Sequence, residues 1–195
     1  MIEHRLVLVL GAGASRPFGF PTGDELYNSI ITELGGKGNG QLYSLLHEAG
    51  FEHQEINKFH SALSRAGTQS VDAFLEHRAE FRDVGKAAIA SALLRHEHEE
   101  TVHANNESNW YRYFFEKLNS KFEDFYKNSV SVLTFNYDRS LEHFLYTALI
   151  NKYGKTPEEC VRQVRVFPII HLYGQLGEFL TCPPKTPPGI IEELR

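Results

Sequence analysis

The chain has 195 residues, a formal net charge of −5, two cysteines, and apolar and charged fractions of 42% and 23%. These values are typical of a globular protein that is long enough to bury a core. The negative charge argues against binding nucleic acid or an anionic membrane through bulk electrostatics, and the apolar runs are too short to span a membrane. Two cysteines cannot form a four-cysteine zinc site, and their small number predicts a reducing, cytoplasmic location.

The first predicted element is a buried strand over residues 5–10, where RLVLVL forms a continuous apolar run. It ends in the sequence Gly11-Ala-Gly13-Ala-Ser15. Glycines after a strand let the backbone approach a phosphate, and the hydroxyl of Ser15 adds a hydrogen-bond donor. The turn lacks the third glycine of the usual dinucleotide fingerprint and the lysine of a P-loop, so a tight turn without a ligand is an alternative.

A helix is predicted to begin near Gly23, because Thr22 and Glu25 have the spacing of a capping box. Its apolar face is predicted to consist of Leu26, Ile30, Ile31 and Leu34. The glycines at positions 35, 36 and 38 are expected to end this helix. Helical spacing dominates as far as Lys127, so we expect a large all-helical insertion over residues 24–127.

Two more strands are predicted after the insertion, over residues 129–135 and 164–172. Between them, Thr156, Pro157 and Glu159 form a second helix-start signal. Strands that alternate with helices predict an α/β fold, here a Rossmann-like parallel sheet flanked by helices.

We expect a single domain over residues 1–195, in which residues 5–23 and 128–195 form the Rossmann-like part. Three strands make a thin sheet. Either the chain is a fragment of a longer protein, or strands in the middle have been missed.

Polar side chains stand at the ends of the later two strands. Asn136 and Asp138 follow the second strand directly, and His171 lies near the end of the third. Ligands of open α/β sheets bind beyond the carboxyl ends of the strands, so these residues and the Gly-rich turn predict one site. Alternatively, Asp138 caps the next helix, and His171 is a hydrogen-bonded core histidine.

Four motifs, taken in order, resemble those of sirtuins. They are Gly11-Ala-Gly13-Ala-Ser15, Gly19-Phe-Pro21, Thr134-Phe-Asn136-Tyr-Asp138 and His171-Leu-Tyr-Gly174. The set is most similar to the SIR2-like domain of bacterial anti-phage defence proteins. The resemblance covers most of residues 5–177 and includes residues 70–75 and 109–114.

This resemblance implies a Rossmann-like site for NAD and hydrolysis of NAD to nicotinamide and ADP-ribose, which depletes NAD on infection. It also implies an activating partner protein or fused domain, and we expect a homo-oligomer. A non-catalytic module that senses NAD or ADP-ribose within a larger assembly is the alternative. The resemblance does not extend to histone-type deacylases, because those enzymes carry a zinc ribbon of four cysteines and this chain has two cysteines.

The resemblance also assigns residues to roles. Asn136 faces the nicotinamide ribose and positions water, and Asp138 binds the carboxamide. The family's catalytic histidine aligns with Tyr173, and His171, two residues earlier, is predicted to share its face of the strand. Either His171 acts as a displaced base, or Tyr173 takes that role, or NAD binds without turnover. The remaining cofactor-binding residues are Gly11, Ala12, Gly13 and Ser15, at the pyrophosphate, and Pro21.

These residue types suit the chemistry. Cleavage of the nicotinamide–ribose bond passes through an oxocarbenium-like transition state, and nicotinamide leaves as a neutral molecule. The protein therefore needs to place a water molecule and steady a cationic sugar more than it needs a strong acid. An amide such as Asn136 can orient water, and a histidine such as His171 can accept a proton.

Two other patterns have plainer interpretations. His98 and His103 are five residues apart, which places them on different helix faces, so we expect no metal site. The aromatic residues between Trp110 and Phe125 are interpreted as a core stripe and not as a base-stacking platform.

Overall fold

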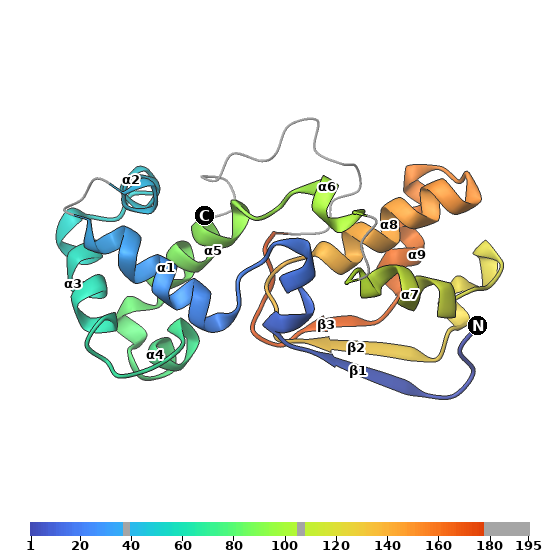
Figure 1. Ribbon diagram of the computed structural model, residues 1–195, viewed down its shortest axis with the longest axis horizontal. Helices are drawn as coiled ribbons and strands as arrows, with labels where there is room; N and C mark the ends of the chain where they lie inside the picture. The colour runs from blue at the N-terminus through green and yellow to red at the C-terminus, as the bar shows by residue number, and fades with distance from the viewer. Residues whose placement is uncertain (37–39, 105–107, 178–195) are drawn as a thin grey trace. The chain divides into compact units, whose positions relative to one another are not determined.

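The computed structural model describes residues 1–36, 40–104 and 108–177. These residues form two compact units, the first made of residues 1–19 and 98–177 and the second of residues 20–97 (Figure 1). The helical stretch that was expected as one insertion over residues 24–127 is thus divided. Its last part, residues 98–104 and 108–127, belongs to the same unit as the sheet.

The first unit contains a three-stranded parallel sheet, which confirms the α/β class. Its strands are β1 (Leu6–Leu10), β2 (Val130–Thr134) and β3 (Ile169–His171), in the order β1-β2-β3. The register pairs Leu10 with Thr134 and Thr134 with His171, so the strands end in one row. The residues that follow this row therefore meet at one edge of the sheet.

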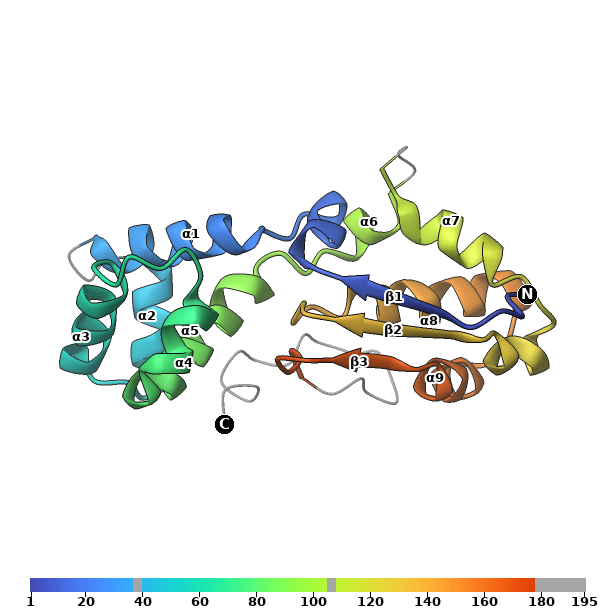
Figure 2. The ribbon, with the colours of Figure 1, turned by 90° about the horizontal axis from the view of Figure 1, so that it is seen from below.

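Helices of the first unit cover one face of this sheet (Figures 1 and 2). They are α6 (Glu99–Val102), α7 (Trp110–Lys117), α8 (Ser140–Tyr153) and α9 (Pro157–Val166), with the 3-10 helices η1 (Ala12–Ala14), η2 (Arg16–Phe18) and η4 (Phe122–Lys127). Phe18 stacks on Tyr111 with ring centroids 3.9 Å apart, and both side chains are buried. Of the predicted aromatic core stripe, Tyr111, Phe114, Phe122 and Phe125 are buried, Trp110 and Phe115 are half-buried, and Tyr113 is exposed.

No described helix of the first unit covers the opposite face of the sheet (Figure 2). Val7, Val9 and Ile170 are between 50% and 64% exposed there. The strand order β1-β2-β3 explains this. Connections between parallel strands are almost always right-handed, and here both connections step in the same direction across the sheet, so their helices lie on the same face. Parallel sheets are nearly always covered on both faces, so this apolar face is unusual.

The third strand is shorter than predicted. Residues 164–166 were expected to be extended, but they form the last turn of α9, with Val164 buried on its inner face. The capping box between Thr156 and Glu159, with Pro157 at the first helical position, starts this helix as predicted. Pro168 ends it, because the residue before a proline is driven to extended geometry, as Phe167 is.

All the regular elements in the described residues of the second unit are helices. Its elements are α1 (Gly23–Gly35), α2 (Gln41–Glu48), α3 (His53–Leu63), α4 (Val71–His77), η3 (Ala79–Phe81) and α5 (Arg82–Leu94). The predicted capping box of Thr22 and Glu25 is present, and α1 ends at Gly35. In the parts of both units that the structure describes, no helix is long and apolar enough to cross a membrane.

Candidate functional site

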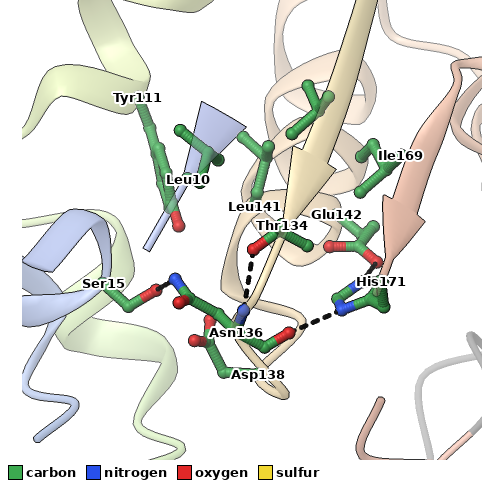
Figure 3. A pocket seen from close by; sticks show the side chains of 11 residues that line it. Leu10, Ser15, Tyr111, Thr134, Asn136, Asp138, Leu141, Glu142, Ile169 and His171 are labelled. Carbon is green, nitrogen blue, oxygen red and sulfur yellow. Dashed lines mark hydrogen bonds and ion pairs between the residues drawn. The ribbon is translucent and has the colours of Figure 1, made fainter. Parts of the chain in front are cut away.

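A small cavity lies where the three strands of the first unit end (Figure 3). Its volume is about 10 Å³, room for about one water molecule. It is lined by Leu10, Ser15, Tyr111, Val132, Thr134, Asn136, Asp138, Leu141, Glu142, Ile169 and His171. Four residues predicted for the site, Ser15, Asn136, Asp138 and His171, therefore lie around one cavity.

The side chain of Asn136 joins two of the predicted motifs. Its amide nitrogen donates to the hydroxyl oxygen of Ser15 at 2.9 Å (Figure 3). The same nitrogen donates to the carbonyl oxygen of Gly11 at 3.1 Å. The strand-end asparagine after β2 is thus bonded to the Gly-rich turn after β1. In the sequence, Asn136 is separated from Gly11 by 125 positions and from Ser15 by 121 positions.

The backbone of Asn136 is held from both sides by side chains. Its N–H donates to the hydroxyl of Thr134 at 3.0 Å, and its carbonyl oxygen lies 2.8 Å from Nδ1 of His171 (Figure 3). Thr134 and His171 are paired in the sheet register. Two neighbouring strands therefore fix the residue that follows β2.

The side-chain oxygen of Asn136 is buried without a hydrogen-bond partner among the described residues. The Gly11 carbonyl can only accept, so the amide nitrogen must face it, and this fixes the direction of the oxygen. Asn136 itself is 9% exposed. A buried polar atom without a partner is rare in native proteins, and water or a ligand is its usual explanation.

His171 has both ring nitrogens engaged. Nε2 lies 2.9 Å from Oε1 of Glu142, and the two side chains are 4% and 5% exposed. Arg139 donates to the same carboxylate oxygen at 3.1 Å. A carbonyl and an ionised carboxylate only accept hydrogen bonds, so with Glu142 ionised both ring nitrogens carry hydrogen and the imidazole is a cation.

The pKa of His171 follows from these contacts. Burial of the ring disfavours the charged form, but the hydrogen bond and negative charge of Glu142, with the Asn136 carbonyl, raise the pKa above its ordinary value of 6.5. In this arrangement the ring has no lone pair with which to accept a proton. The base role implied for His171 stays a prediction, and it requires one of these two hydrogen bonds to break.

Asp138 is buried against the start of α8. One of its carboxylate oxygens accepts hydrogen bonds from the backbone N–H and the hydroxyl of Ser140, the first residue of the helix. It lies one residue before the N-cap, which is Arg139, so it satisfies a helix-start amide without being the cap itself. The Ser140 hydroxyl is also 2.7 Å from the hydroxyl of Tyr111.

Tyr111 stays protonated at any physiological pH. Burial of its ring, followed by the negative charge of Asp138, raises the pKa of the phenol. Because the Ser140 hydroxyl gives its one hydrogen to Asp138, the Tyr111 hydroxyl donates its own hydrogen to Ser140.

The Gly-rich turn is open on its outer side. Gly11 and Gly13 are exposed, and a Cβ added at either position would meet no atom within 4 Å. Neither glycine has the left-handed geometry that only glycine adopts readily. The packing of the chain therefore does not require glycine at these two positions. A ligand that closely approached the backbone would require glycine there, because a side chain would block it.

Five predicted site residues do not line the cavity: Gly11, Gly13, Ala12, Pro21 and Tyr173. Ala12 is half-buried within η1, and Pro21 belongs to the second unit. Tyr173 is 53% exposed and packs on Phe135, with ring centroids 5.5 Å apart. Strand geometry was expected to keep Tyr173 on the same face as His171, but β3 ends at His171, so the alternation of faces stops there.

No family model, curated protein or solved structure matches this chain. The resemblance to the SIR2-like group therefore stays a prediction from the short sequence motifs alone. Within the described parts, no group of three or more His, Cys, Asp or Glu residues could hold a metal ion.

Sequence reasoning missed the carboxylate of Glu142. A signal was present, because Glu142 lies three and seven residues before Leu145 and Leu149, both of which are fully buried. A carboxylate at this spacing belongs to the inward face of an apolar helix and needs a buried partner. Tyr111 was identified only as part of the aromatic core.

Proposed function

We propose that the first unit binds NAD at the edge where β1, β2 and β3 end, and hydrolyses its nicotinamide–ribose bond. The observation that carries this proposal is the unpartnered, buried side-chain oxygen of Asn136, which lines a cavity with room for one water. The same side chain is bonded to the Gly-rich turn through Gly11 and Ser15.

In this proposal the Gly-rich turn binds the pyrophosphate. The open space beside Gly11 and Gly13 lets a phosphate come close to the backbone. The first N–H groups of a helical turn have no partner within the turn and can donate to an anion. These features support a dinucleotide and not a small neutral ligand.

The reaction breaks the bond between C1′ of the ribose and the nicotinamide nitrogen. The bonding electron pair goes to nicotinamide, which leaves as a neutral molecule, and a water oxygen forms the new bond to C1′. The water gives up one proton to the surrounding solvent, so the products are nicotinamide, ADP-ribose and H⁺. The oxygen of Asn136 would accept a hydrogen bond from the attacking water, and orienting the water lowers the barrier.

The size of the cavity sets a condition on this reaction. A space of about 10 Å³ holds one water but not a nicotinamide ring. Productive binding therefore requires the side chains around Asn136 to move apart. An activating partner or a second copy of the chain, as the resemblance implies, is our proposal for what favours the open arrangement.

The second candidate is a module that senses NAD or ADP-ribose without turnover. One observation favours it: the imidazole of His171, the sole histidine that lines the cavity in the described part of the chain, has both nitrogens engaged. In that case binding would change the hydrogen bonds around Asn136, but no nicotinamide would be released.

Nicotinamide release from NAD by the purified chain tests the proposal, with Asn136→Ala as the variant and Asn151→Ala as the matched control. Asn151 is an exposed asparagine whose amide donates to a backbone carbonyl in α8. We expect release by the wild type, a fall of at least about 100-fold in Asn136→Ala, and no change in Asn151→Ala. Equal release by Asn136→Ala would refute the proposed role.

Calorimetric titration of NAD separates the two candidates where no release is detected. Binding without release supports the sensor, and the absence of both contradicts NAD as the ligand. For the proposed role in anti-phage defence, we expect cells that express the wild type, but not Asn136→Ala, to lose NAD on infection, as measured in cell extracts.

A further inference from the structure

We propose that Glu142 is a positioning residue, which fixes the side chain of Asn136 by holding His171 against the Asn136 carbonyl. The inference rests on the proposed function, because it deepens the account of the same site. It adds a residue that none of the sequence motifs contains.

The path from Glu142 to Asn136 consists of two hydrogen bonds. Oε1 of Glu142 lies 2.9 Å from Nε2 of His171, and Nδ1 of the same ring lies 2.8 Å from the Asn136 carbonyl oxygen. A rigid ring with an acceptor at each nitrogen has one orientation. The carboxylate therefore determines where the ring stands, and the ring determines where the Asn136 backbone stands.

The backbone in turn determines the side chain of Asn136. With its N–H held by Thr134 and its carbonyl held by His171, the peptide groups on both sides of Cα are fixed. The side-chain nitrogen is then within reach of Gly11 and Ser15, and the side-chain oxygen lines the cavity. Loss of the ring contact would free one of these restraints.

The charges around His171 make Glu142 the residue that decides its state. Glu142 and Arg139 come from the start of α8, while Asp138 and the phenol of Tyr111 line the same cavity. Glu142 is the acidic group among these that touches the ring. Arg139 shares its carboxylate oxygen and also donates to the carbonyl of Gly177, which holds the chain beyond β3.

Glu142 acts through another residue and is therefore distinct from a catalytic residue. Its side chain is 5% exposed and its carboxylate faces two cations. A purely structural ion pair would affect unfolding without a specific effect on Asn136. A positioning role predicts that the NMR signals of the Asn136 side-chain amide change whenever the Glu142 carboxylate is altered.

The test is an NMR comparison of the full chain with Glu142→Gln and Glu142→Asp, using Glu116→Gln as the matched control at an exposed glutamate of α7. The probes are the ring nitrogens of His171 and the side-chain amide of Asn136, identified by its loss in Asn136→Ala. We expect the wild-type ring to stay doubly protonated at a pH where the Glu142→Gln ring is neutral. The Asn136 amide signals should move or broaden in Glu142→Gln and keep their positions in Glu116→Gln.

Glu142→Asp keeps the charge and removes one methylene, so it remains informative if Glu142→Gln does not fold. In Glu142→Asp we expect the ring to stay cationic while the Asn136 amide signals move. Unchanged Asn136 signals in a folded variant at Glu142 would overturn the proposal. This readout needs no turnover, so it distinguishes a failure of the positioning role from a failure of NAD hydrolysis.

Nicotinamide release supplies a second readout. If the wild type turns NAD over, we expect Glu142→Gln to lower kcat by about 10-fold or more with little change in KM, since misplacing a reacting group affects the chemical step. A rise in KM with unchanged kcat would instead assign Glu142 to substrate binding and contradict the positioning role.

Discussion

Asn136 is held by hydrogen bonds through three of its four polar groups. Its backbone N–H, its carbonyl and its side-chain nitrogen all have partners, and its side-chain oxygen faces the cavity without one. The sequence could indicate Asn136 because it directly follows an apolar strand. It could not indicate which of its atoms stays unpaired, since that depends on contacts with residues far away in the chain.

The openness of the Gly-rich turn leads to a test of phosphate binding. A Cβ at Gly13 would meet nothing in the free protein, so Gly13→Ala should fold with a stability equal to or slightly above that of the wild type. The same methyl group would occupy space that a bound pyrophosphate needs. We expect at least a roughly 10-fold loss of NAD affinity by calorimetry, and an unchanged affinity would show that the ligand does not approach this turn.

The ion pair of His171 and Glu142 predicts a pH dependence of stability. The folded pKa of His171 is raised above 6.5, so its stabilising contribution is complete below that pH and is lost as the pH rises through the folded value. The urea midpoint of the first unit should therefore fall as the pH rises above 6.5. Fluorescence of Trp110, the one tryptophan of the chain, reports this unit.

The same measurement on Glu142→Gln provides the control for this pH effect. Without the carboxylate, burial of the ring disfavours the cation, and the fall in the midpoint over this pH range should disappear or reverse. A wild-type midpoint that is constant or rises over the range would contradict the assigned charge state.

At the scale of elements, local signals predicted the starts of the two capped helices and, to within one residue, the starts of β1 and β2, but not the start of β3. Both capping boxes, at Thr22 and Thr156, start helices at the predicted positions. The apolar run from Val164 to Leu172 suited either a strand or a buried helix face. Residues 164–166 belong to α9, because a capped helix continues until a residue such as Pro168 stops it.

The capping box of α9 gives a prediction about stability. Thr156 accepts a hydrogen bond from the backbone N–H of Glu159, so Thr156→Ala should destabilise the first unit by about 1 kcal/mol. The urea midpoint followed through Trp110 is the measurement. Thr156→Ser keeps the acceptor oxygen and should restore most of the loss, whereas equal losses in both variants would assign the effect to packing.

The polar contacts between elements lay beyond sequence reasoning. Glu142 on α8 and His171 on β3 are 29 residues apart, and each has a plausible separate role in the sequence. Only the register of β2 with β3, and the packing of α8 on the sheet, place the carboxylate against the ring. The small volume of the cavity likewise depends on how closely all of these elements pack.

At the scale of the whole molecule, the sheet of the first unit has an apolar face that its described helices leave uncovered. Val9, Leu133 and Ile170 lie in one row across that face. The prediction of a homo-oligomer makes a second copy of the chain the expected cover. Burial of such a row would give favourable free energy, because apolar area is removed from water.

This expectation is tested with Val9→Lys, which places a charge at a 64% exposed position of the face. We expect the wild type to sediment as a dimer or larger species and Val9→Lys to shift towards the monomer at equal concentration. Tyr113→Lys, at an equally exposed position on α7, is the matched control and should leave the oligomer intact. A monomeric wild type, or an oligomer indifferent to Val9→Lys, would contradict this use of the face.

The central claim is that NAD binds where the Gly-rich turn and the strand-end asparagine meet. A titration of the chain with NAD, followed by NMR at the side-chain amide of Asn136, tests it most directly. We predict a saturable shift of this amide signal, with a smaller response of the exposed amide of Asn151. An Asn136 amide that does not respond at saturating NAD would place the ligand elsewhere and contradict the claim.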